Sequence, residues 1–98
     1  MSIVEEISKL WWHNGHLNED QRDFLIEMLQ NHKPRYCIET GFATGRSTVT
    51  TLIAAQPERL VSVDISLDYM GARSHANSLL EKFSNLRIVE GDSYNMLN

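Results

Sequence analysis

The chain has 98 residues, and its shares of apolar and charged residues (42% and 22%) are typical of one globular domain rather than a disordered segment. A net charge of −4 with only nine scattered lysines and arginines argues against a nucleic acid partner. Acidic residues near the N-terminus and the lack of an apolar run of ~18 residues argue against a signal peptide and a membrane span. The single cysteine is typical of a reducing, cytoplasmic compartment.

Two amphipathic helices are predicted at the N-terminus. The first covers about residues 2–12, where apolar side chains recur at helical spacing. Asn18 begins the second, because Gln21 three residues later completes a capping-box pattern, and Pro34 ends it. Residues 1–33 therefore form an N-terminal helical segment.

The remaining segment, 34–98, alternates between short apolar runs and helical patterns. Strands are predicted over 35–40, 60–64 and 86–89, with helices from 44 or 45 to 55 and from 66 to 83. Ser66 is expected to cap the second of these helices, and His75 within it is expected to be exposed. Crossovers of this kind give parallel strands with right-handed connections, so the segment is an α/β domain.

Polar residues stand at the carboxyl end of every predicted strand. The first strand leads into Thr40-Gly41, the second ends in Asp64, and Asp92-Ser93 follow the third. Ligands of open parallel sheets bind at the carboxyl ends of the strands. These three places are therefore expected to form one site.

The segment from Glu39 to Ser47 is typical of a nucleotide-binding turn between a strand and a helix. Gly41 and Gly45 permit backbone conformations that a Cβ atom forbids, and the helix N-terminus offers N–H groups to a carboxylate or phosphate. Asp64 lies 23 residues after Gly41, where an acceptor for ribose hydroxyls is expected. The alternatives are a tight structural loop and, for Asp64, a helix cap.

The spacing of the turn narrows the choice of nucleotide. A phosphate-binding P-loop has a longer gap between its glycines and a lysine where this chain has Arg46, which disfavours ATP and GTP hydrolysis. A dinucleotide fingerprint needs a glycine where Ala43 stands. An NAD(P)-binding oxidoreductase domain and a non-catalytic nucleotide-binding module remain as alternatives.

These residues resemble class I S-adenosylmethionine-dependent methyltransferases, and within them the catechol O-methyltransferase-like branch with its E-x-G-x-x-x-G-x-S motif. The resemblance covers roughly residues 19–98. It implies half of a Rossmann-like methyltransferase fold, with three parallel strands in the order 3-2-1, flanking helices and the two N-terminal helices.

The resemblance also implies S-adenosylmethionine as the cofactor and assigns its contacts to the strand ends. Those at the methionine end are Glu39, Thr40, Gly41, Phe42, Gly45 and Ser47, with the Ser47 hydroxyl on the cofactor carboxylate. Those at the adenosine end are Asp64 and Ile65, on the ribose and adenine, and Asp92 and Ser93 on the adenine edge. An acceptor-only carboxylate such as Asp64 suits the ribose diol.

In the family the sheet continues with a fourth strand beside the first, and this sequence ends at Asn98 before such a strand. The chain is therefore expected to be the cofactor-binding part of a methyltransferase for a small-molecule acceptor, with no catalytic or metal-binding residue assigned. An unpaired edge of strand 35–40 invites another chain. That chain would be the rest of a longer enzyme or a second copy, whose first strand would run antiparallel.

Overall fold

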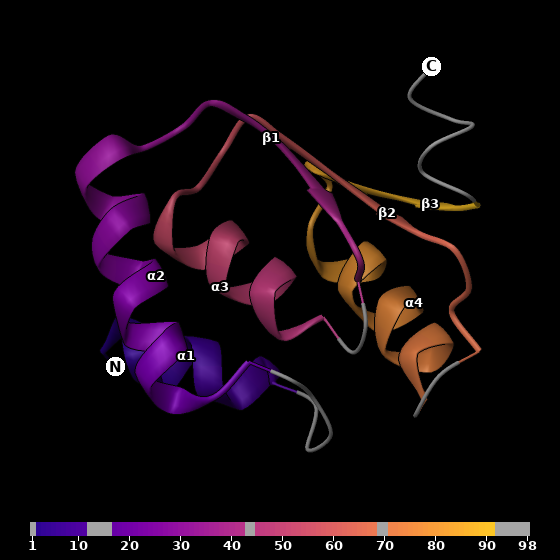
Figure 1. Cartoon of the computed structure of the whole chain (residues 1–98), viewed down its shortest axis with the longest axis horizontal. Coiled ribbons are helices and arrows are strands. Elements are labelled where there is room, and N and C mark those ends of the chain that lie inside the picture. Colours follow the sequence, from indigo (N-terminus) through magenta and orange to yellow (C-terminus); the bar gives the residue numbers. More distant parts are fainter. Residues whose placement is uncertain (1, 12–16, 43–44, 69–70, 92–98) are drawn as a thin grey trace.

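The computed structural model describes residues 2–11, 17–42, 45–68 and 71–91. In this part of the chain helices and strands alternate after two initial helices (Figure 1). The elements are α1 (Ile3–Leu10), α2 (Glu19–His32), β1 (Tyr36–Thr40), α3 (Arg46–Ala54), β2 (Arg59–Asp64), α4 (Ala72–Lys82) and β3 (Leu86–Glu90). No helix within these ranges is long and apolar enough to cross a membrane.

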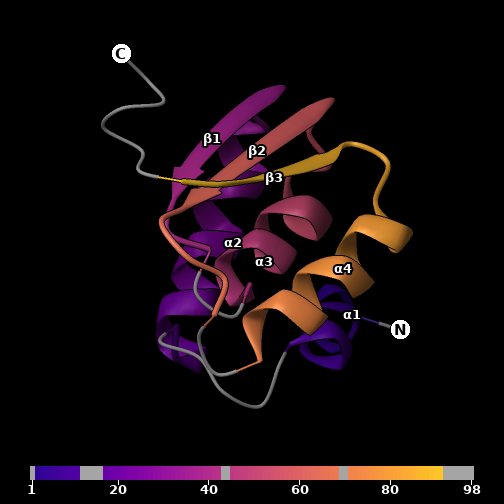
Figure 2. The same cartoon turned by 90° about the vertical axis from the view of Figure 1, so that its right-hand side faces the viewer.

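The three strands form a parallel sheet in the order β1-β2-β3, which is the predicted order 3-2-1. The register places Thr40 beside Val63, and Asp64 beside Glu90, so the carboxyl ends of the strands meet at one edge of the sheet. The helices all lie on the same face of the sheet (Figure 2). The predicted α/β class is confirmed, and in the described part of the chain the other face carries no helix.

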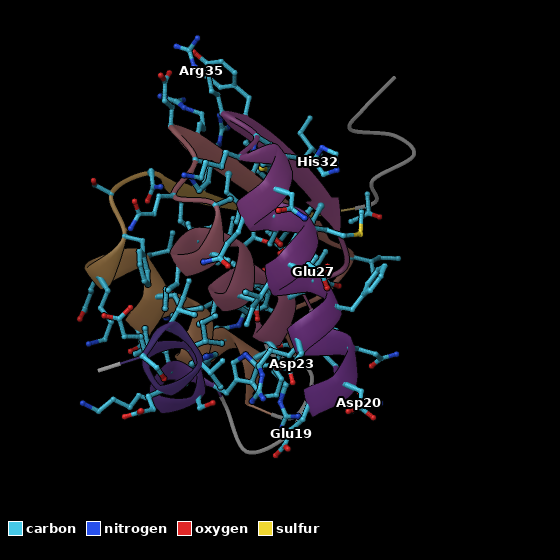
Figure 3. All side chains as sticks on the ribbon, turned by 90° about the vertical axis from the view of Figure 1, so that its left-hand side faces the viewer. Glu19, Asp20, Asp23, Glu27, His32 and Arg35 are labelled. Atoms are coloured by element: carbon cyan, nitrogen blue, oxygen red, sulfur yellow. The ribbon has the colours of Figure 1, made fainter. Side chains whose placement is uncertain are left out.

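Local capping explains where the two N-terminal helices begin. The backbone N–H of Glu5 donates to the Ser2 hydroxyl at the start of α1. Asn18 and Gln21 form both bonds of the predicted capping box at the start of α2. Carboxylates follow the exposed side of α2 from Glu19 to Glu27 (Figure 3), and this side also carries the exposed Phe24 and Met28. The opposite side, with the buried Ile26, covers the core.

The predicted start of the helix before β3 is wrong. This helix begins at Ala72, where Gly71 precedes it in a left-handed conformation (φ 83°), and not at Ser66. The Ser66 hydroxyl accepts instead from the backbone N–H of Asp68 (3.1 Å) and forms a local turn. A serine hydroxyl satisfies a turn as readily as a helix end, so the residue type alone does not distinguish the two.

The core lies between the helices and the sheet. Its fully buried side chains include Ile7 of α1, Val49 of α3, Leu60 of β2 and Leu79 of α4. Phe42, two residues after β1, joins them with only 2% of its surface exposed. The N-terminal helices therefore share one core with the sheet, and the chain leaving β1 is anchored in it by an aromatic ring.

Candidate functional site

The sheet ladder continues past the ends of both outer strands. The backbone N–H of Gly41 donates to the Val63 carbonyl (2.6 Å), and that of Gly91 donates to the Asp64 carbonyl (2.6 Å). These two bonds hold the turns that leave β1 and β3 against the end of β2. The structure thus brings Gly41, Asp64 and Gly91 side by side.

The turn between β1 and α3 needs glycine for two physical reasons. Gly41 (φ 92°) and Gly45 (φ 85°) both occupy the left-handed region, which L-residues with a Cβ atom seldom adopt. A Cβ atom at Gly45 would in addition lie 2.7 Å from Cζ of Phe42 and 3.2 Å from Cδ2 of His75. At Gly41 no atom of the described residues lies within 4 Å of that position. The turn is closed behind Gly45 and open at Gly41.

Glu39 joins the end of β1 to the first turn of α3. Its carboxylate accepts hydrogen bonds from the hydroxyls of Ser47 (3.3 Å) and Thr48. Burial raises the pKa of Glu39, these hydrogen bonds act in the opposite direction, and the nearby charge of Asp64 raises the pKa further. The Ser47 hydroxyl donates to Glu39 here, and its predicted contact with a cofactor carboxylate stays a prediction. The backbone N–H groups at the start of α3 lack intrahelical acceptors and are further donors for an anion.

Asp64 ends β2 half-buried, and Oδ1 accepts from the backbone N–H of Ser66 (3.3 Å). It does not cap the following helix, which begins at Ala72. The next residue, Ile65, has 74% of its surface exposed.

Two polar residues of this region were not predicted from the sequence. Thr48 donates a hydrogen bond to the Glu39 carboxylate, as Ser47 does. Glu90 accepts from the backbone N–H of Leu67 (2.9 Å) and from Arg73 (2.7 Å). The sequence could have indicated Glu90 by its place directly after the predicted strand 86–89. The structure pairs it with Asp64.

The N-terminal segment contacts the start of α3 through Trp11. The indole N–H lies 3.2 Å from the Arg46 carbonyl and 3.3 Å from Thr50 Oγ1. The Arg46 guanidinium lies 4.5 Å from the centre of the Trp11 ring and donates to the Leu17 carbonyl (2.9 Å). These contacts hold the first residue of α3 in place from outside the sheet.

His75 contradicts its predicted exposure. It is buried, with 8% of its surface accessible, and its ring lies behind the glycine turn. Burial lowers the pKa of His75, while a hydrogen bond with the Leu10 backbone acts in the opposite direction. The ring therefore fills the space between the N-terminal helices and the turn in its neutral form at physiological pH.

The other predicted site residues divide into two groups. Thr40 is exposed at the end of β1, and Phe42 turns its ring into the core, so it can meet a ligand only through its backbone. Asp92 and Ser93 lie outside the described residues. Among the residues that the structure describes, no cluster of three His, Cys, Asp or Glu side chains is arranged to hold a metal ion.

No protein-family model matches the chain. No curated protein matches it either. Solved structures do match over nearly the whole chain. Methyltransferase PaMTH1 of Podospora anserina, solved with S-adenosylhomocysteine, has a TM-score of 0.74 at 18% identity, over 97% of this chain and 43% of its own.

Two further structures give the same result. The O-methyltransferase TomG of Streptomyces achromogenes, involved in tomaymycin synthesis and solved with S-adenosylmethionine, has a TM-score of 0.72 at 17% identity, over 95% of this chain and 45% of its own. Cofactor-bound Rv0187 from MTB has a TM-score of 0.69 at 18% identity, over 97% and 44%.

The chain has the fold of part of these methyltransferases. It spans less than half the length of each of the three structures. The predicted half of a Rossmann-like methyltransferase fold is thereby confirmed.

Proposed function

We propose that the chain is the S-adenosylmethionine-binding, N-terminal part of a methyltransferase. The observation that carries the proposal is the turn from β1 to α3, where two left-handed glycines lead to a helix N-terminus whose first turn is hydrogen-bonded to the half-buried Glu39. Asp64 stands beside this turn at the end of the neighbouring strand. The similar structures solved with S-adenosyl ligands support the proposal.

The charges of the turn favour this ligand over a dinucleotide. Glu39 and Asp64 are close enough for the charge of Asp64 to raise the pKa of Glu39. The pyrophosphate of NAD would add negative charge to this place, whereas S-adenosylmethionine carries an ammonium and a sulfonium cation. Its single carboxylate suits the start of α3, where the helix dipole and the backbone N–H groups favour an anion.

Different residues of the chain would hold the two ends of the ligand. The turn of Gly41 and Gly45 would hold the methionine end, with Glu39 orienting the first turn of α3. Asp64 would accept the ribose hydroxyls, and Ile65 would cover the adenine ring. Asp92 and Ser93 are proposed at the adenine edge.

The bound cofactor supplies an electrophilic methyl group, and the acceptor would be a small molecule bound by residues outside this chain. The transfer would replace the bond from sulfur to methyl by a bond from the acceptor atom to methyl, and the acceptor would give up a proton. The role of the described residues is to hold and orient the cofactor. The free thiol of Cys37, half-buried in β1, fits the proposed cytoplasmic location.

Titration calorimetry of the 98-residue chain with S-adenosylhomocysteine, S-adenosylmethionine and NAD tests the proposal. The two S-adenosyl ligands are expected to bind, and Asp64→Ala is expected to weaken them by about tenfold or more, because a hydrogen-bonded carboxylate is lost. The control is Glu81→Ala, an exposed carboxylate near the far end of α4. Binding of NAD alone would contradict the proposal.

The proposed partner surface is the open edge of β1. Tyr36 and Ile38 of this strand each have 67% of their surface exposed, on the face of the sheet that carries no helix in the described residues. Within those residues β1 pairs with β2 alone, which leaves its other edge for another strand. Parallel sheets are as a rule covered on both faces, and open apolar edges attract other strands. We propose that this edge pairs with a second copy, with the two β1 strands antiparallel.

Light scattering after size-exclusion chromatography tests the homodimer. The chain is expected to elute as a dimer at micromolar concentration, and Ile38→Lys is expected to make it a monomer. Leu80→Lys on α4, which is 39% exposed and lies away from the edge, is the matched control. A monomeric parent chain would contradict the proposed pairing.

A further inference from the structure

The segment that follows β2 is held by a carboxylate from β3. Glu90 Oε2 accepts from the backbone N–H of Leu67 (2.9 Å) and from Arg73 Nη2 (2.7 Å). Arg73, in the first turn of α4, also reaches Asp68 Oδ1 through Nε (3.3 Å) and Nη2 (3.2 Å). Three parts of the chain, the end of β3, the segment after β2 and the start of α4, are thus joined through two side chains.

This arrangement bears directly on Asp64. Asp64 and Glu90 are register partners at the ends of adjacent strands, and the Asp64 carbonyl accepts from the Gly91 N–H (2.6 Å). Oδ1 of Asp64 also accepts from the N–H of Ser66, one residue before Leu67. The position of the Asp64 carboxylate therefore depends on the segment that Glu90 holds.

Arg73 favours the ionised form of Glu90. Its hydrogen bond is the main cause that lowers the pKa of Glu90, and the N–H of Leu67 acts in the same direction. Glu90 accepts bonds from two donors of the protein, which fixes its carboxylate rather than leaving it to rotate toward a ligand. The carboxylate at the neighbouring position, Asp64, is the one proposed to meet the ribose.

We propose that Arg73 and Glu90 are positioning residues for the adenosine half of the cofactor. They hold residues 64–68 in the shape in which Asp64 and Ile65 meet the ribose and the base. The inference rests on the proposed function, because it assigns these residues a role toward the same ligand. A site held by a second layer of hydrogen bonds loses affinity when that layer is loosened, although no ligand contact is removed.

Calorimetry of the 98-residue chain with S-adenosylhomocysteine and with adenosine tests the role. Arg73→Gln and Glu90→Gln are each expected to weaken both ligands by about three- to five-fold, within the range that exposed charged pairs reach. The double variant is expected to be no weaker than either single variant, because the two residues act as a unit. The matched control is Arg35→Gln, which removes an exposed ion pair with Glu58 (2.6 Å) at the opposite end of the sheet.

Amide hydrogen exchange at Leu67 gives a readout that needs no ligand. Exchange is expected to quicken in both the Arg73 and the Glu90 variants and to stay unchanged in Arg35→Gln. If the parent chain binds neither ligand, the proposed function fails and the positioning role with it, while the exchange data still report on the hydrogen bond. If the parent binds and the Arg73 and Glu90 variants bind as tightly as Arg35→Gln, this inference alone is overturned.

Discussion

Replacing Gly45 with alanine tests how strictly the geometry of the turn depends on glycine. The residue has φ 85°, and the added Cβ atom would lie 2.7 Å from Cζ and 3.0 Å from Cε2 of Phe42. The ring of Phe42 has 2% of its surface exposed and cannot move into solvent. His75 Cδ2, at 3.2 Å, closes the other side. The ring or the turn must therefore shift.

The geometry at Gly45 sets the expected loss of stability. A left-handed conformation costs an L-residue about 1–2 kcal/mol, and an extra methyl in a filled core costs about 1–3 kcal/mol. Gly45→Ala should therefore lower the free energy of unfolding by about 2–5 kcal/mol, a large part of the roughly 5–15 kcal/mol typical of a domain. Gly41→Ala has a similar φ of 92° but open space at its Cβ position, so it should lose only the first contribution, about 1–2 kcal/mol.

Urea unfolding followed by circular dichroism measures both variants. Gly45→Ala is expected to be less stable than Gly41→Ala by about 1–3 kcal/mol, and Phe42→Leu in the Gly45→Ala background should recover part of the loss. The order should reverse for the affinity for S-adenosylhomocysteine. Gly41→Ala should weaken binding more than Gly45→Ala, because a methyl group on Gly41 faces the open side of the turn. Equal stability of the two variants, or a greater loss in Gly41→Ala, would refute the reasoning.

Three other changes test the supports of the site. Asn18→Ala removes the bond from the Gln21 N–H and should cost about 1 kcal/mol in urea unfolding, whereas Asn18→Gly should cost only a few tenths. Trp11→Phe removes the indole N–H that lies near the Arg46 carbonyl and should cost about 1 kcal/mol; a stability equal to that of the parent would show that this bond contributes nothing. Burial raises the pKa of Glu39, so its ionised form lowers stability at neutral pH. Relative to Glu39→Gln, the parent should therefore gain stability as the pH falls from neutral toward 4.5, the ordinary pKa of a glutamate, and the opposite trend would contradict the raised pKa.

Features that depend on neighbours in sequence were predicted correctly. The capping box of Asn18 and Gln21 needs only three residues of separation, and the positive φ of Gly41 and Gly45 follows from a tight turn between a strand and a helix. The strand order followed from the alternation of elements together with the family resemblance. In each case the local pattern and the tertiary structure favour the same conformation.

Features that depend on distant partners were missed. Ser66 has the residue type of a helix cap, but the N–H of the next residue, Leu67, is taken by Glu90 of β3, and the helix begins only after Gly71. His75 was expected to be exposed on its helix, yet its ring fills space behind Gly45. Neither contact leaves a trace in the sequence near the residue concerned, because each partner is supplied by another element.

The supports of the candidate site all come from within this chain. The N–H of Gly41 reaches β2, Glu39 holds the first turn of α3, and Glu90 holds the segment after Asp64. None of these bonds depends on the fourth strand that the family resemblance implies. If the proposed function is right, cofactor recognition and acceptor recognition are carried by separate parts of the enzyme. The edge of β1 is the one proposed to pair with a second copy, and covering it should raise the stability of the sheet without changing which residues meet the cofactor.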